Sequence, residues 1–131
     1  MIFVDSNVPM YLVGADHPNK LRVIELLPQL LYACELLVTS AETFQEILHR
    51  YLALRDRDSM NAAYEAMELM VSGVAEVTKE DVDGARAMSG NYPRLSSRAC
   101  LHVAMMRRIG CSRIWSYDLG FASVSSIQRI E

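Results

Sequence analysis

Short apolar runs alternate with longer segments of helical periodicity along the whole chain. The apolar runs predict five strands, the last of them at an edge, over residues 2–4, 36–39, 74–77, 113–117 and 127–130. Strands that alternate with helices are typical of an α/β fold built on a parallel sheet. No repeat, low-complexity tract or linker interrupts the pattern, so we expect a single domain over residues 1–131.

Between the predicted strands, apolar side chains recur three or four positions apart, as one buried face of a helix requires. We predict helices after Asp5, from 18 with a break or kink at Pro28, around 44–51, around 60–70, over 79–88 and over 99–106. Thr78 and Asp81 form a capping-box pattern. The helix over 99–106 is apolar on nearly all sides and should be buried on two of them. Five methionines read as core or as a dimer surface: Met60, Met67, Met70, Met105 and Met106.

Composition narrows the class of protein further. A formal charge of −3 argues against a protein that coats nucleic acid nonspecifically through a broad basic face. The three cysteines form no CxxC pair, and no histidine lies at a zinc-ligand spacing from them, so we expect free thiols in a reducing cytosol and no zinc. No apolar run is long enough for a membrane span, and Asp5 interrupts the apolar start. We therefore expect a cytoplasmic protein.

Acidic residues follow the predicted strands where a parallel sheet places its ligands. Asp5 comes directly after the first strand and Asp118 after the fourth, so both should reach the carboxyl-terminal edge of the sheet. Each could hold a metal ion, although a helix cap is the more common role of a single Asp after a strand. Glu46 is the third candidate, with an i,i+4 pair to Arg50 as its alternative. Glu42 is discounted, because Thr39 to Glu42 fits a capping box.

Three segments carry a resemblance to a known family across essentially the whole chain. They are the opening MIFVDSNVPMYLVG, the middle TSAETFQEILHRY and the closing LSSRACLHVAMMRRIGCSRIWSYDLGF. In order and spacing they resemble the PIN-domain ribonucleases, and most closely the VapC toxins of bacterial and archaeal toxin–antitoxin pairs. The resemblance implies a PIN-like three-layer α/β/α sandwich on a small parallel sheet. It also implies a metal-dependent endoribonuclease toxin that cleaves structured RNA (tRNA or rRNA), is neutralised by a VapB-like antitoxin and forms a homodimer.

The same resemblance assigns roles to the acidic residues. Asp5, Glu46 and Asp118 match the positions that hold divalent metal, either Mg²⁺ or Mn²⁺, both of which favour oxygen ligands. We expect Asp5 and Asp118 to be direct ligands, and Glu46 to bind a second metal or to act through water. Asn7 and Ser116 match small polar positions beside the acids.

The chain departs from the family at one acidic position. The family motif Arg-Asp-Ala-Leu-His-Val-Ala corresponds here to residues 98–104, and Ala99 stands where the motif has Asp. Either a deliberate Asp-to-Ala change has disarmed a toxic nuclease, or the chain is a naturally weakened member. A non-catalytic PIN-fold protein that binds antitoxin or RNA is the alternative function. Arg98 is a candidate RNA contact or a helix-surface ion pair, and His102 is interpreted as a core histidine with satisfied hydrogen bonds.

Overall fold

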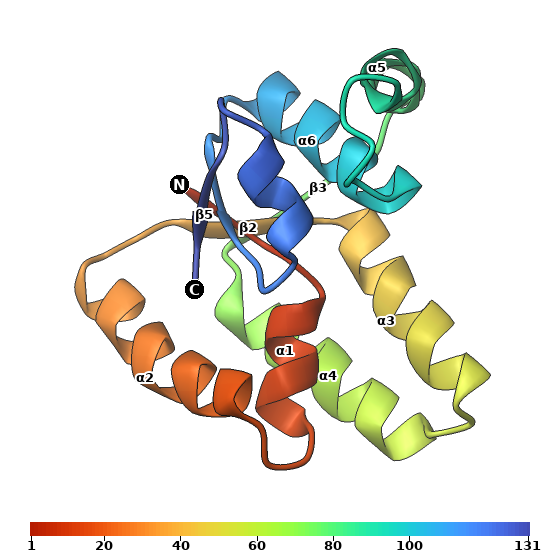
Figure 1. Ribbon diagram of the computed structural model, residues 1–131. Helices are drawn as coiled ribbons and strands as arrows, with labels where there is room; N and C mark the ends of the chain where they lie inside the picture. Colours follow the sequence, from red (N-terminus) through yellow and green to blue (C-terminus); the bar gives the residue numbers. More distant parts are fainter.

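The computed structural model describes all of residues 1–131 and contains five strands, six α-helices and one 3₁₀ helix (Figure 1). The strands are β1 Ile2–Val4, β2 Leu37–Ser40, β3 Gly73–Ala75, β4 Arg113–Trp115 and β5 Gln128–Ile130. The helices are α1 Asn7–Val13, α2 Pro18–Tyr32, α3 Ala41–Ala53, α4 Arg57–Met70, α5 Lys79–Ser89, α6 Ser97–Ile109 and the 3₁₀ helix η1 Leu119–Ser123. None of the helices has the length and apolar composition that crossing a membrane requires.

All five strands are parallel and lie in the order β3-β2-β1-β4-β5, so the first strand of the chain is the central strand of the sheet. The chain builds outward from β1 through β2 to β3, and then crosses to the other side of β1 to form β4 and β5. The strand order therefore reverses between β1 and β4. Ligands of open parallel sheets bind at such a reversal, beyond the carboxyl ends of the strands.

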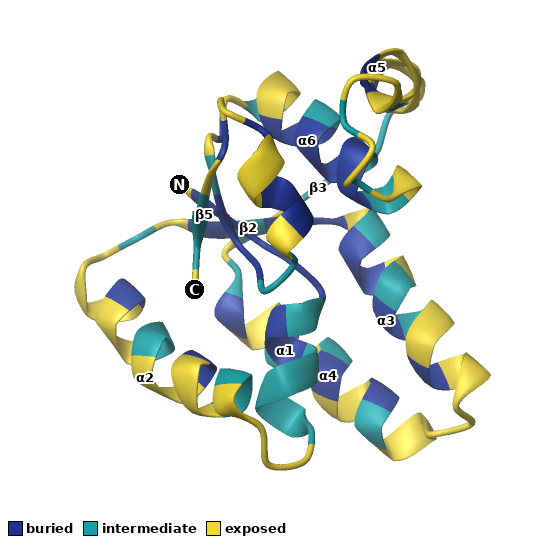
Figure 2. Cartoon of the chain, viewed as in Figure 1, coloured by how far each residue is buried: buried dark blue, intermediate teal, exposed yellow.

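Helices cover both faces of this sheet. Along β1, Ile2 and Val4 point into one apolar cluster and Phe3 into a second, because successive side chains of a strand alternate between its faces. The first cluster contains side chains of α1 to α4, and the second contains side chains of α5, α6 and η1. Figure 1 shows the two groups of helices on opposite sides of the strands, and Figure 2 shows their buried faces turned toward the sheet. The expected three-layer α/β/α sandwich is confirmed.

Two expectations about the helices are resolved by packing. Helix α2 runs through Pro28 without a break, since Val23 and Leu30 lie two turns apart on one face and are both buried in the core. Their burial outweighs the hydrogen bond that Pro28 cannot donate. The five methionines that allowed a core or a dimer surface are all buried, at 8% exposure or less, and belong to the core.

Capping residues explain where helices α3, α5 and α6 begin and where α6 ends. The capping box of Thr78 and Asp81 is present at the start of α5. The one expected over Thr39 to Glu42 is wrong, because the N-cap of α3 is Ser40, whose Oγ accepts the N–H of Thr43 (3.4 Å). Ser96 caps α6, and Gly110 ends it in the left-handed region (φ 74°), which glycine adopts without steric cost.

Asp81 fixes α5 to α6, and its loss should destabilise the fold. Its Oδ1 accepts a hydrogen bond from Arg108 Nε (2.8 Å), and its Oδ2 accepts from an Arg108 guanidinium N–H (2.9 Å) and the Thr78 N–H (2.9 Å). We expect Asp81→Asn to lower the free energy of unfolding by about 2 kcal/mol. The change weakens both charge-assisted hydrogen bonds to Arg108 and the capping box of α5. Urea denaturation at pH 7 measures this, with Asp83→Asn as control: the exposed Lys79–Asp83 pair should contribute less than about 0.5 kcal/mol.

The ion pair between Asp81 and Arg108 also makes the stability of the fold depend on pH. The Arg108 guanidinium holds the pKa of the Asp81 carboxyl below its ordinary value. The contribution of the ionised Asp81 carboxyl to the free energy of unfolding is therefore complete above its unfolded-state pKa, near about 4. That contribution is lost as the pH falls through the lower folded-state pKa. Between pH 7 and pH 3, Asp81→Asn should lose less stability than the native chain. Equal losses in the two proteins would contradict this role for Asp81.

Candidate metal centre

Three elements bring the predicted acidic residues to the reversal between β1 and β4. Asp5 directly follows β1, and its backbone N–H donates to the Trp115 carbonyl at the end of β4 (3.1 Å). Glu46 lies on α3, which begins immediately after β2, and Asp118 lies in the turn between β4 and η1. Because β2 and β4 flank β1, the parallel topology directs all three residues to the same edge of the sheet.

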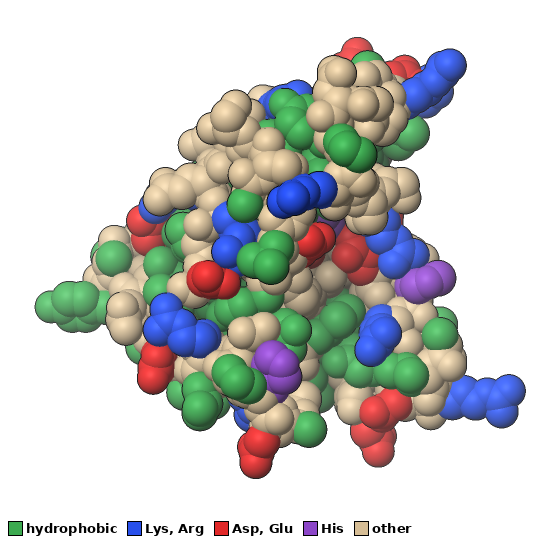
Figure 3. All heavy atoms as spheres, in the orientation of Figure 1, with side chains coloured by type: hydrophobic (Ala, Val, Ile, Leu, Met, Phe, Trp, Pro, Cys, Tyr) green, Lys and Arg blue, Asp and Glu red, His purple; other side chains and the backbone are tan.

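The three carboxylates line one polar cavity of about 480 Å³. Its lining is Asp5, Ser6, Asn7, Glu46, Ser96, Ser97, Arg98, Ala99, His102, Asp118 and Phe121. In the space-filling view, acidic side chains lie in a recess near the middle of this face, with basic side chains at its border (Figure 3). Every predicted site residue except Ser116 lines the cavity, and Ser116 lies directly behind Asp5.

Hydrogen bonds from three neighbours fix the Asp5 carboxylate. Its Oδ1 accepts from the Ser6 N–H (2.7 Å), and its Oδ2 accepts from Ser116 Oγ (2.5 Å) and Asn7 Nδ2 (3.1 Å). Asn7 also donates to Ser116 Oγ (3.2 Å), so the two small polar residues predicted beside the acids hold each other and Asp5. Asp5 is 5% exposed, and burial raises the pKa of its carboxyl despite these bonds.

Glu46 faces the cavity and forms no ion pair with Arg50, so that alternative is wrong. Its Oε2 accepts a hydrogen bond from Ser6 Oγ (2.7 Å), and its Oε1 lies 2.5 Å from His102 Nε2. Burial favours the neutral acid, but His102 and Ser6 outweigh it and hold the pKa of Glu46 below its ordinary value. Ser6 had not been expected in the site. Its position directly after Asp5 is the signal in the sequence that could have found it.

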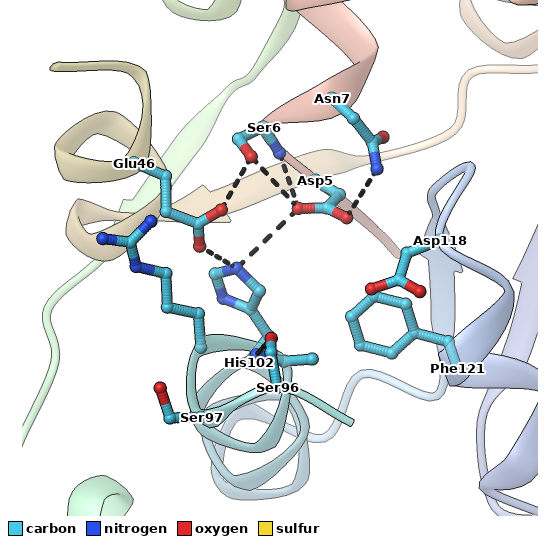
Figure 4. Close-up of a pocket in the computed structure, with 11 residues that line it drawn as sticks. Asp5, Ser6, Asn7, Glu46, Ser96, Ser97, His102, Asp118 and Phe121 are labelled. Carbon is cyan, nitrogen blue, oxygen red and sulfur yellow. Dashed lines mark hydrogen bonds and ion pairs between the residues drawn. The ribbon is translucent and has the colours of Figure 1, made fainter. Parts of the chain in front are cut away.

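His102 confirms one half of its prediction and contradicts the other. It is buried at 2% exposure, as expected, but neither ring nitrogen makes a hydrogen bond of acceptable geometry. Its Nε2 points between Glu46 Oε1 and Asp5 Oδ1, which lies 3.8 Å away (Figure 4). Burial disfavours the imidazolium, yet the carboxylates prevail and raise the pKa of His102. The signal lay in its spacing, since residues three apart on a helix share a face and His102 follows Ala99 by three.

Asp118 lies farther from this cluster than the sequence implied. Its Oδ1 accepts the Gly120 N–H (2.8 Å) and caps η1, so one carboxylate oxygen has a structural partner. It lines the cavity on the side of Asp5 away from Glu46 (Figure 4). The residues whose ligand atoms all lie within 4.8 Å of one another are Asp5, Glu46 and His102. That Asp118 is a direct ligand stays a prediction.

The first turn of α6 forms the remaining wall. Ala99 lines the cavity and is 3% exposed, so a carboxylate at this position would face Asp5 and Glu46. Arg98 Nε lies 3.8 Å from Glu42 Oε1 on α3, which places the arginine at the cavity border in a helix–helix ion pair. Glu42 therefore pairs with Arg98 and takes no part in a capping box.

The donor atoms in this cavity fit a divalent cation. His102 Nδ1 is buried without a hydrogen-bond partner, and Glu46 Oε1 and His102 Nε2 have only their mutual contact at 2.5 Å, which lacks hydrogen-bond geometry, whereas buried polar atoms are nearly always hydrogen-bonded. Two carboxylates held close together also repel each other, and a cation between them relieves that repulsion. Asp5 and Glu46 lie where they could hold such a cation, and Asp118 lies across the cavity.

Comparisons with known proteins agree with this geometry. The PIN-domain family model matches residues 2–127. Ribonuclease VapC13 of Mycobacterium tuberculosis is 45% identical over 130 residues, covering 99% of each chain, and ribonuclease VapC23 of the same species is 37% identical over 123 residues, covering 94% of this chain and 97% of the relative.

Two solved structures share the fold. The crystal structure of M. tuberculosis VapC20, a toxin that cleaves the sarcin-ricin loop, superposes with a TM-score of 0.75 over 95% of each chain at 19% identity. A toxin–antitoxin complex from Klebsiella pneumoniae matches with a TM-score of 0.66 at 13% identity, over 100% of this chain and 97% of the other. The sequence identities, the parallel sheet and the acidic cavity at its strand reversal together place this chain in the PIN-domain family, among the VapC ribonucleases.

Proposed function

We propose that this chain is the endoribonuclease toxin of a toxin–antitoxin pair and cleaves structured RNA in a reaction that depends on a divalent metal ion. The observation that carries the proposal is the convergence of Asp5, Glu46 and Asp118 on one polar cavity at the strand reversal of a PIN-domain sheet. RNA as the substrate class follows from the VapC ribonucleases to which the chain is similar over nearly its full length. Structured RNA, either tRNA or rRNA, is the expected target.

Each cavity residue has a distinct task in this proposal. Asp5, Glu46 and Asp118 would hold the cation, either Mg²⁺ or Mn²⁺, which lowers the pKa of the attacking water and neutralises charge on the phosphodiester. Ser116 and Asn7 orient Asp5 through the bonds at 2.5 and 3.1 Å. Arg98 borders the cavity with a side chain 37% exposed, and it can leave Glu42 to contact an RNA phosphate.

A protein partner is the second part of the proposal. We expect a VapB-like antitoxin, in keeping with the toxin–antitoxin complex that shares this fold, and a homodimer of the toxin itself. The acidic cavity offers an antitoxin arginine a charged binding site, and its occupation would exclude RNA phosphate. Three free cysteines suit a reducing cytoplasm, where the proposed RNA substrates also lie.

A non-catalytic role is the second candidate, and Ala99 is the observation that favours it. The cavity wall carries a methyl group where the family motif carries a carboxylate, so we expect a lower affinity for the cation. Such a protein would still bind antitoxin or RNA without cleaving it. RNA binding by gel shift, with no cleavage under any cation, would support this candidate.

RNA cleavage by the native chain tests the proposal. Incubation of a structured RNA pool with Mg²⁺ or Mn²⁺ should give discrete fragments, and EDTA should abolish them. Asp118→Asn should reduce the rate at least about tenfold by removing a charge from the metal site, whereas the exposed Asp83→Asn should leave it unchanged. Cleavage that survives EDTA would contradict metal dependence, and an unchanged rate in Asp118→Asn would contradict the role of Asp118.

A further inference from the structure

We propose that His102 is a metal ligand through Nε2, so that the cation is held by two carboxylates and one imidazole. This inference rests on the metal centre of the proposed function and changes its chemistry. A site of oxygen donors alone suits Mg²⁺, whereas an imidazole nitrogen favours first-row transition ions. The chain should therefore bind Mn²⁺ in preference to Mg²⁺.

The positions of three atoms carry the inference. His102 Nε2 lies 2.5 Å from Glu46 Oε1 and 3.8 Å from Asp5 Oδ1, and the ligand atoms of these residues all lie within 4.8 Å of one another. Ligand atoms around one small divalent ion are separated by roughly 3 to 4 Å, given metal–ligand distances of about 2.1 Å. The cluster needs only small side-chain adjustments to surround such an ion.

The surroundings of the His102 ring agree with a ligand role for Nε2. The side chain is 2% exposed, Nδ1 has no hydrogen-bond partner, and Nε2 contacts only the two carboxylates, without hydrogen-bond geometry. A histidine with a purely structural role normally satisfies at least one nitrogen when it is buried this deeply. Packing against Phe3, with ring centroids 5.1 Å apart, fixes the ring so that Nε2 points between the two carboxylates (Figure 4).

A nitrogen ligand at His102 matters because Ala99, on the same helix, offers no atom that can bind a metal. Residues 99 and 102 share a face of α6, and both line the cavity. The methyl group at 99 supplies no donor, which leaves His102 as the donor that α6 directs at Asp5 and Glu46. Only the neutral imidazole binds a metal, so the cation would displace the Nε2 proton to solvent, and the two carboxylates then balance the charge of one divalent ion. His102 therefore supplies the α6 donor that Ala99 lacks.

Pulsed EPR of the Mn²⁺-loaded chain tests the assignment directly. The spectrum should contain a nitrogen coupling that changes when the protein is labelled with ¹⁵N-histidine. His102→Gln should abolish this coupling, whereas His49→Gln, which alters an exposed histidine on α3 outside the cavity, should retain it. Bound Mn²⁺ without a nitrogen coupling in the native chain would overturn the inference, even if His102→Gln failed to fold.

Affinity measurements supply a second readout. In calorimetric titrations, His102→Gln should lose at least about tenfold in Mn²⁺ affinity and much less in Mg²⁺ affinity. Equal losses for the two ions would contradict the nitrogen ligand and indicate a merely structural role. Far-UV circular dichroism establishes that the variant is folded.

The outcomes separate this inference from the function on which it rests. A nitrogen coupling in a chain that cleaves no RNA supports the His102 ligand and contradicts the nuclease. Metal-dependent cleavage without the coupling supports the nuclease and overturns the His102 ligand. A native chain that binds no Mn²⁺ overturns the inference, and the RNA assay then decides the function separately.

Discussion

The Ala99→Asp variant should cleave RNA in Mg²⁺ about 10- to 100-fold faster than the native chain, a factor typical of repairing a weakened metal site. Ala99 lines the cavity from the first turn of α6, so the new carboxylate would face Asp5 and Glu46. The additional oxygen donor raises affinity for Mg²⁺ above all, because Mg²⁺ takes oxygen ligands by preference. Initial cleavage rates on one structured RNA, measured across a range of Mg²⁺ concentrations, give the comparison.

A matched control separates ligation from added charge. Ser97 also lines the cavity from the first turn of α6, but it is exposed. Ser97→Asp therefore introduces the same charge nearby, and its rate should stay within about twofold of the native rate, since exposed charges interact weakly through water. A folded Ala99→Asp variant with the native rate would show that position 99 does not limit activity. An equal gain in both variants would assign the effect to charge alone.

The Asp5→Asn variant should lose both cleavage and cation-dependent stabilisation. Asp5 belongs to the three-residue cluster, and its carboxylate is fixed by three hydrogen bonds, so we expect a loss of at least about 100-fold in rate. A cation at 100 times its dissociation constant should raise the unfolding free energy of the native chain by about 2.7 kcal/mol, and that of the variant by almost nothing. Urea denaturation with and without Mn²⁺ measures the difference.

Without a cation, the same variant should be at least as stable as the native chain at pH 7. Burial raises the pKa of Asp5, so its charged form costs stability at every pH above the unfolded-state pKa. An amide has the same shape, carries no charge and can still hydrogen-bond to Ser116. A variant that is strongly destabilised without a cation, or that retains the full effect of Mn²⁺, would contradict the assignment of Asp5 as a ligand.

The layers of the fold were predictable because they depend on local patterns. Runs such as Ile2 to Val4 are apolar on both faces, as only a strand between two layers of helices requires, and all five predicted strands are present within a few residues. A break at Pro28 is absent, which local propensity could not predict because it cannot weigh a lost hydrogen bond against the burial of Leu30 in the core. The 3₁₀ helix η1 carried too short a pattern to be predicted.

The sequence by itself determined the alternation of strands and helices, because each has its own hydrophobic periodicity. It also determined which residues follow each strand, because these are neighbours in the chain. Asp5 and Asp118 were identified from their positions after strands, and Glu46 by resemblance.

Only the tertiary structure decided which side chains meet. Glu46 on α3 contacts Ser6, the N-cap of α1, and His102 on α6. Glu42 on α3 contacts Arg98 on α6. These contacts join residues 40 to 56 positions apart in the chain, and such pairings depend on how α3 and α6 pack across the edge of the sheet. No local pattern encodes that distance, so the spacing of His102 from Ala99 indicated a shared helix face, but only the folded chain shows its contact with Glu46.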